Sequence, residues 1–105
     1  MINQVLIAAA IPHQEAQYPD PPDGTFAVWL DSVDADGSDC DNCIFTHDCT
    51  IELYAPTIPA GNEDKKRLLA ELDARGIHYT TQGWYWLKDL RRYQEVIEFT
   101  HYQKT

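Results

Sequence analysis

Apolar and polar residues follow two different periods along this chain, and the changes of period divide it into elements. In residues 2–10 the apolar positions recur at helical spacing, which predicts a short amphipathic helix that ends before Pro12. The stretch "QYPDPPDG" that follows is rich in proline and predicts a loop. A second turn-rich stretch, "DADGSDCDN", separates two segments in which apolar and polar residues alternate.

Those two alternating segments predict strands. In residues 25–33 one face holds Phe26, Val28 and Leu30, and the other holds Ala27 and Trp29. Residues 43–54 predict a longer strand with a mostly apolar inner face, made of Cys43, Phe45, His47, Cys49, Ile51 and Leu53.

Residues 63–75 predict the main helix of the chain. Asn62 is the expected N-cap, and Glu63 and Asp64 stand in the first turn, where the helix dipole favours acids. Its buried stripe is expected to be Leu68, Leu69 and Leu72. Gly76 fits the C′ position beyond the helix, with Ile77 packing back onto it.

The remainder, "HYTTQGWYWLKDLRRYQEVIEFTHYQ", predicts two strands joined by a turn near residues 88–92. The predicted order is therefore α-β-β-α-β-β over residues 1–105. We expect one α+β domain, in which an antiparallel sheet carries helices packed on it.

Charge is divided unevenly along the chain. Residues 1–60 contain ten acids and no lysine or arginine, whereas residues 61–105 contain seven acids and eight bases, for a total of −9. Such a chain lacks the basic footprint that nucleic acid phosphates require, so sequence-specific DNA binding is not expected. Three cysteines cannot all pair within one chain, which fits a reducing cytosol or a particle assembled there. No apolar run reaches the length of a membrane span.

The cysteines pose the question of a zinc site, with Cys40, Cys43, His47 and Cys49 as the candidate ligands. Cys43 and Cys49 fall on one predicted strand, however, and six residues of strand span about 20 Å, too far for one tetrahedral site. A core strand with small apolar thiols is the preferred interpretation.

The acidic segment before the cysteines poses a calcium question. Ser32, Asp34, Asp36 and Gly37 resemble the start of an EF-hand loop, but Cys43 stands where the bidentate glutamate belongs and the flanks are strands. A solvated acidic loop is the simpler interpretation. The chain has no glycine-rich phosphate loop and no Gly-x-Ser-x-Gly elbow, so we predict neither an enzyme nor a cofactor.

Several short motifs together suggest a family. The stretches "FAVWLDS", "TIELYAP", "LDARGIHY" and "YQEVIEF" resemble the small tail-completion proteins of long-tailed bacteriophages, in the tail terminator and tail-to-head joining group. The resemblance spans residues 11–99, and the cysteine- and aspartate-rich loop departs from it. It implies the element order predicted above.

The resemblance also implies a role. It is that of a structural virion protein, assembled in the host cytoplasm, whose hexameric ring ends the tail tube and joins it to the head connector. Its partners would be itself, the tube protein and the connector proteins, with DNA passing through the ring. A head-to-tail ring needs two complementary patches on each subunit. Our candidates for interface residues are Asp34, Asp36, Asp39, Asp41, Trp84, Trp86, Arg91 and Arg92.

Two other classes stay open at this point. One is a small zinc-binding regulator built on the four ligands named above, which stoichiometric zinc would favour. The other is a small host-directed binding module, which a monomer at all concentrations would favour. Trp84 and Trp86 share a face at strand spacing, which favours a core position, with an interface patch as the alternative.

Overall fold

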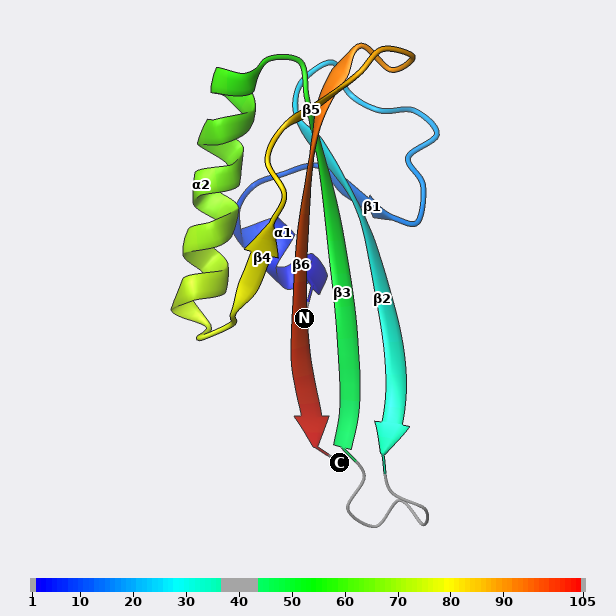
Figure 1. Cartoon of the computed structure of the whole chain (residues 1–105), viewed down its shortest axis with the longest axis vertical. Coiled ribbons are helices and arrows are strands. Elements are labelled where there is room, and N and C mark those ends of the chain that lie inside the picture. Colours follow the sequence, from blue (N-terminus) through cyan, green and yellow to red (C-terminus); the bar gives the residue numbers. More distant parts are fainter. Residues whose placement is uncertain (1, 37–43, 105) are drawn as a thin grey trace.

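A computed structural model of the chain describes residues 2–36 and 44–104. Within them, one six-stranded sheet packs against two helices (Figure 1). The elements in chain order are α1 (Ile2–Ala8), β1 (His13–Glu15), β2 (Phe26–Asp36), β3 (Ile44–Ala55), α2 (Ile58–Ala74), β4 (Tyr79–Thr81), β5 (Tyr85–Leu87) and β6 (Arg92–Lys104). The three long strands β2, β3 and β6 run side by side along the longest dimension of the molecule, 48 Å.

The sheet has the order β1-β2-β3-β6-β4, and β5 also pairs with β6. β1 runs parallel to β2, and every other pair is antiparallel. The arrangement of helices and strands is α+β, but the expected purely antiparallel sheet and the order α-β-β-α-β-β are wrong. The extra strands β1 and β4 have three residues each, too few for an alternating pattern to identify them.

Both helices cover one face of the sheet. In the strands, that face is formed by Cys49, Ile51 and Leu53 of β3 and by Ile97 and Phe99 of β6, which pack against α1 and α2. The helices contribute Val5, Leu6, Leu68 and Leu72, all buried. The predicted apolar stripes of both helices are therefore confirmed, with Leu69 only half-buried.

The start of α2 differs from the prediction. The helix begins one and a half turns earlier, with Thr57 as its N-cap, and the Thr57 hydroxyl accepts a hydrogen bond from Ala60 N at 3.3 Å. Pro59 fits because the first helical turn leaves backbone N–H groups unbonded. Asn62, the predicted cap, lies inside the helix, and its side chain accepts a hydrogen bond from Trp84 Nε1 at 2.7 Å.

The end of α2 is as predicted. Gly76 has φ +69°, the left-handed conformation expected at C′. Ile77 N donates to Leu72 O and Gly76 N donates to Asp73 O, both at 3.0 Å, which is the Schellman pattern.

The C-terminal region forms a hairpin as expected. β5 and β6 pair antiparallel from Leu87↔Arg92 to Tyr85↔Gln94, so the turn falls at residues 88–91. Arg91 closes it with φ +51°, and its N–H reaches Lys88 O at 3.3 Å.

Candidate functional site: a three-stranded extension

Beyond the helices, three strands continue as a narrow ribbon (Figure 1). We call this part the extension: residues 32–36 of β2, 44–48 of β3 and 100–104 of β6, in continuous antiparallel register. Predicted strand 25–33 is thus too short, because β2 runs to Asp36 into a segment expected to be a turn. The pairing with β3 outweighs the weak strand propensity of its aspartates.

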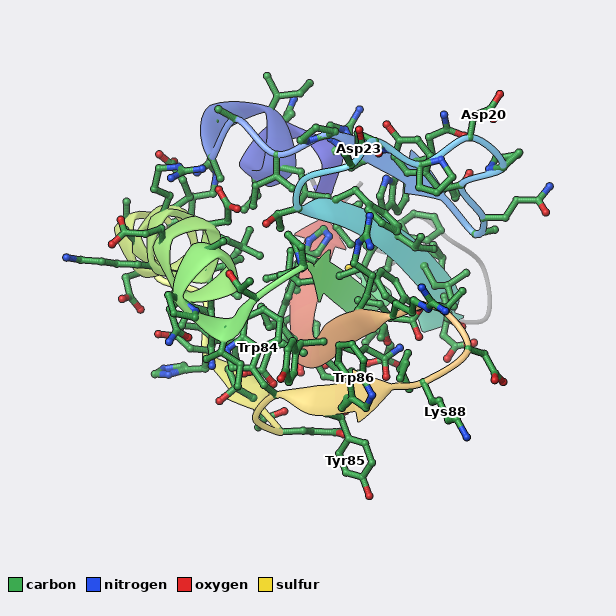
Figure 2. The ribbon with its side chains drawn as sticks, turned by 90° about the horizontal axis from the view of Figure 1, so that it is seen from above. Asp20, Asp23, Trp84, Tyr85, Trp86 and Lys88 are labelled. Atoms are coloured by element: carbon green, nitrogen blue, oxygen red, sulfur yellow. The ribbon has the colours of Figure 1, made fainter. Side chains whose placement is uncertain are left out.

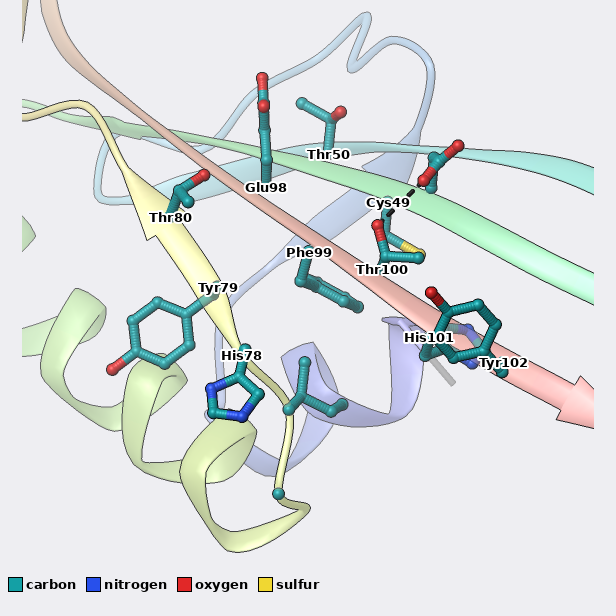
Figure 3. A pocket seen from close by; sticks show the side chains of 13 residues that line it. Cys49, Thr50, His78, Tyr79, Thr80, Glu98, Phe99, Thr100, His101 and Tyr102 are labelled. Carbon is teal, nitrogen blue, oxygen red and sulfur yellow. Dashed lines mark hydrogen bonds between the residues drawn. The ribbon is translucent and has the colours of Figure 1, made fainter.

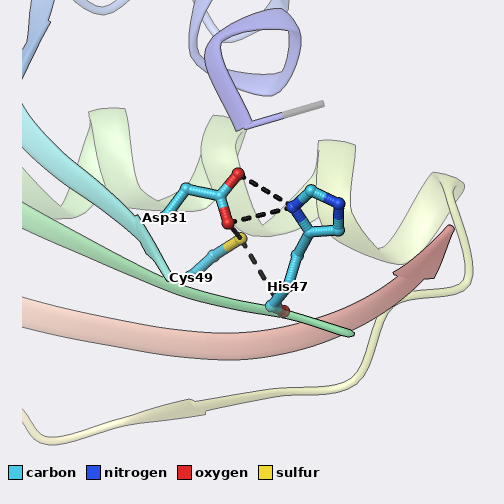
Figure 4. Close-up of polar contacts among 3 residues, drawn as sticks. All are labelled: Asp31, His47 and Cys49. Atoms are coloured by element: carbon cyan, nitrogen blue, oxygen red, sulfur yellow. Dashed lines mark hydrogen bonds and ion pairs between the residues drawn. The ribbon is translucent and has the colours of Figure 1, made fainter. Parts of the chain in front are cut away.

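A polar cluster lies where the extension leaves the helices. Asp31 on β2 accepts a hydrogen bond from His47 on β3, whose Nδ1 lies 3.0 Å from each carboxylate oxygen (Figure 4). The Cys49 thiol donates to Asp31 Oδ1 at 3.7 Å. Burial, and then the Asp31 carboxylate, raise the pKa of Cys49 to about 12, so its thiol is not an activated nucleophile.

His101 of β6 completes this cluster. Its ring stacks on that of His47, with centroids 4.3 Å apart and planes 9° from parallel. Burial, and then His47, lower the pKa of His101, against a smaller opposite effect of Asp31. Its Nε2 is buried and has no hydrogen-bond partner among the described residues.

The zinc and calcium hypotheses can be compared with the structure only at those candidate ligands that lie in the described residues. Cys40 and Cys43 lie outside the described residues, and so do Asp39 and Asp41. In the described ranges, no group of three or more His, Cys, Asp or Glu side chains is arranged to hold a metal ion. Ser32 and Asp34 lie in a strand of the sheet, which is not the loop between helices that an EF-hand requires.

A groove lies beside β6 where the extension begins (Figure 3). β4 pairs with β6 only as far as Phe99, and Ile77 and His78 lead into β4 from the helix. The groove is lined among others by these residues, by Tyr79 and by Tyr102. It therefore marks the place where the β6 edge loses its neighbouring strand.

Farther along β6, a buried carboxylate fixes the connection between α2, β4 and β5. Glu95 of β6 is fully buried and forms an ion pair with Lys65 of α2. Its other oxygen accepts hydrogen bonds from Gln82 N at 3.1 Å and Gly83 N at 2.5 Å. Glu95 is not among the residues predicted from the sequence, although alternation with Ile97 and Phe99 places it on the buried face.

The two tryptophans have different surroundings. Trp84 precedes β5 and packs against the core, over Gly61 of α2. Trp86 is exposed by about half and lies against Tyr93, with ring centroids 4.8 Å apart. In Figure 2, Trp84 lies toward α2, while Tyr85 projects outward from β5. Around β5, the exposed aromatic surface therefore comes from Tyr85 and Trp86.

The two candidate arginines also differ. Arg91 is exposed in the turn. Arg92 is half-buried and donates to the carbonyl oxygen of Asp23 at 3.1 Å, which ties the hairpin to the proline-rich loop. Of these two, Arg91 alone is free to reach a partner.

The face of the sheet that the helices leave open is acidic from the row of Glu52 to the row of Asp34. This face carries four acids, which alternate with threonines and a serine: Asp34, Asp48, Glu52 and Glu98. All but Glu52 are exposed. No lysine or arginine interrupts the face between rows Val28↔Glu52 and Asp34↔Thr46. A negative face of this kind repels nucleic acid rather than binding it.

Comparison with known proteins gives a fold neighbour. No protein-family model matches the sequence, and no curated protein matches it. A chain of a structure described as "Virion of native gene transfer agent (GTA) particle" superposes with a TM-score of 0.62, 15% sequence identity, and coverage of 96% of this chain and 84% of that chain. The two chains share a fold. Among the described residues, no helix is long and apolar enough to cross a membrane.

Proposed function

We propose that this chain is a structural virion protein of a tailed, phage-like particle, and that it acts in tail completion. Copies of the chain form a ring, of six subunits in the tail-terminator group it resembles, that ends the tail tube and meets the head connector. It has no catalytic role in this proposal. The observation that supports it most is the fold shared along almost the whole chain with a component of a gene transfer agent virion.

The acidic face of the sheet is consistent with this role. A conduit for DNA works best when its wall does not bind the phosphates, and like charges provide that. Asp34, Asp48 and Glu98 are exposed on the face that the helices leave open, so turning this face to the lumen gives a non-adhesive wall.

Negative-stain microscopy combined with native mass spectrometry tests the proposal. Ring-shaped particles of one defined mass are expected from the purified chain, alone or with the tube protein of the same particle. A monomer at every concentration, also with that tube protein, would instead support a binding module. One zinc ion per chain, with unfolding on chelation, would support the zinc-binding alternative that uses Cys40 and Cys43.

A further inference from the structure

The two outer strands of the extension each have an unpaired edge. β1 pairs with β2 only from Ala27 to Trp29. On the other side, β4 pairs with β6 only up to Phe99. Among the described residues, no strand pairs with the outer side of β2 after Trp29 or of β6 after Phe99.

Where β2 is still flanked by β1, its backbone hydrogen bonds show which of its residues point their N–H and C=O groups away from β3. Ala27 N donates to Pro12 O at 2.8 Å, and Trp29 O accepts from Ala16 N at 2.9 Å, so the odd-numbered residues of β2 point their backbone groups away from β3. The register with β3 is unbroken to Asp36. The outward groups of the extension are therefore those of Asp31, Val33 and Ala35.

The same reasoning applies to β6. Val96 O accepts from Gln82 N at 3.3 Å on the side away from β3. The even-numbered residues of β6 therefore point outward, and the register with β3 continues to Lys104. Thr100, Tyr102 and Lys104 present their N–H and C=O groups at this edge.

The two edges lie at the same level and run in the same direction. Ser32, Asp48 and Thr100 form one row across the three strands. β2 and β6 are each antiparallel to β3, and hence parallel to each other. When a subunit is rotated about an axis on the helix-free side of the sheet, with its strands tilted as barrel closure requires, the β2 edge of one copy meets the β6 edge of the next.

We propose that the free edge of β6 in one subunit pairs, in parallel, with the free edge of β2 in the next, so that the extensions close into a single β-barrel. This inference rests on the ring of the proposed function and specifies the contact that closes it. A head-to-tail contact of two different edges is what a cyclic ring requires. Closure also removes both open edges, which are otherwise sites of uncontrolled strand addition.

The side chains favour this pairing over a two-fold one. β2 carries Asp31 and Asp34, so an antiparallel β2–β2 contact would bring two negatively charged strands side by side. Residues 100–104 of β6 contain no acid and end on Lys104. Pairing also covers apolar surface, because Leu30, Val33 and Tyr102 at these edges are 49%, 50% and 71% exposed.

The barrel has a defined inside. The helices occupy one face of the sheet and are too bulky for the lumen, so the acidic face turns inward. A ring of six copies would hold about eighteen strands, a number that leaves an aqueous channel in porins. At about 4.8 Å between strands, the backbone circle would be about 27 Å or more across, before side chains.

A proline at the edge tests the backbone pairing. In Val33→Pro the outward N–H of β2 is lost, while the bonds to β3 made by the neighbouring residues remain. Its matched control, Val33→Thr, changes the side chain and keeps the N–H. We expect the proline variant to lose the ring while its circular dichroism stays that of the parent, and the threonine variant to keep the ring.

Cross-linking tests the partner edge and does not depend on the proline variant folding. Ser32→Cys and Thr100→Cys are nearly isosteric changes at exposed positions of one row, made in a background with Cys40→Ser and Cys43→Ser. A short bis-maleimide should link a mixture of the two single variants into dimers and leave each variant alone unlinked.

The outcomes separate this inference from the function on which it rests. Rings that survive Val33→Pro and show no Ser32–Thr100 link would overturn the edge pairing and leave the ring intact. Linking of Ser32→Cys to itself would show a two-fold β2 contact and would also overturn it. Absence of any assembly in the parent, with or without the tube protein, would overturn the proposed ring itself and the pairing with it.

Discussion

At the scale of single residues, the buried charge of Glu95 has the largest expected effect on stability. Both carboxylate oxygens are engaged, one by Lys65 and the other by the backbone of residues 82 and 83. Glu95→Gln leaves the ammonium of Lys65 without its counter-charge, and the amide oxygen can accept from the two backbone N–H groups only if the amide NH2 turns toward Lys65. Breaking a buried pair in this way costs about 3 kcal/mol or more. Denaturant unfolding measures the loss, and Glu98→Gln on the exposed face should unfold like the parent.

His101 predicts a dependence of stability on pH. Its pKa in the folded protein lies below the ordinary value of 6.5, so the unfolded chain binds the proton more strongly. Its contribution to stability is therefore present above pH 6.5 and is lost as the pH falls below 6.5 toward the folded pKa. Melting temperatures of the parent and of His101→Asn at pH 5 and pH 7.5 provide the comparison.

The parent should lose more stability on acidification than the His101→Asn variant does. His78→Asn is the matched control because His78 is exposed, and its acid response should follow that of the parent. An equal acid response in parent and His101→Asn would show that another group controls the effect.

At the scale of the elements, the start of α2 makes a prediction that separates the two cap assignments. Thr57→Ala should destabilise the protein by about 1 kcal/mol through the lost cap. Asn62→Ala should act differently, because Asn62 holds the indole of Trp84. Tryptophan fluorescence should therefore shift in Asn62→Ala and stay unchanged in Thr57→Ala. The reverse pattern would place the helix start at Asn62.

The contrast between the two ends of α2 shows what sequence alone could predict. Gly76 was identified because a left-handed C′ position has one strongly preferred residue type. Thr57 was missed because Asn62, followed by two acids, is an equally good cap by local chemistry. The structure shows that the Asn62 side chain instead accepts a hydrogen bond from Trp84, which lies 22 positions away in the sequence.

The sheet shows the same limit. The long strands β2, β3 and β6 were predictable because alternation extends over many residues, and the buried side of β3 was assigned correctly at Cys49, Ile51 and Leu53. The cluster of Asp31, His47 and His101 was not, since it depends on the pairing of three strands across the register. His47 and His101 share one row of the sheet and Asp31 lies in the next row on the same face, so the three residues are far apart in sequence and adjacent in space.

At the scale of the whole molecule, several bases of the C-terminal half form ion pairs with acids of the same half and do not balance the acidic N-terminal half. Lys65, Arg67 and Arg75 are engaged with Glu95, Asp64 and Glu71, all of their own half. Arg92 is held by the backbone of Asp23. The exposed bases without an ion pair among the described residues are Lys66, Lys88 and Arg91. In the proposed ring, these three are the bases among the described side chains that could meet acids of another subunit or of the tube protein.

Arg91 is the base best placed for such a contact, and it gives the last prediction. It closes the β5–β6 turn next to the exposed aromatic surface of Tyr85 and Trp86, and arginine is enriched at interfaces for its planar, many-donor head group. We expect Arg91→Glu to weaken assembly, since each rim pair contributes on the order of 1 kcal/mol and the loss recurs at every interface of the ring. Sedimentation at low and high salt measures it: salt should weaken the parent, through screening, and affect the variant less. Lys66→Glu on α2 is the matched charge reversal at a distance from the turn, and circular dichroism confirms the fold of each variant. If Arg91→Glu assembles as tightly as the parent at both salt concentrations, the turn is solvated and the ring is held by contacts of its strands alone.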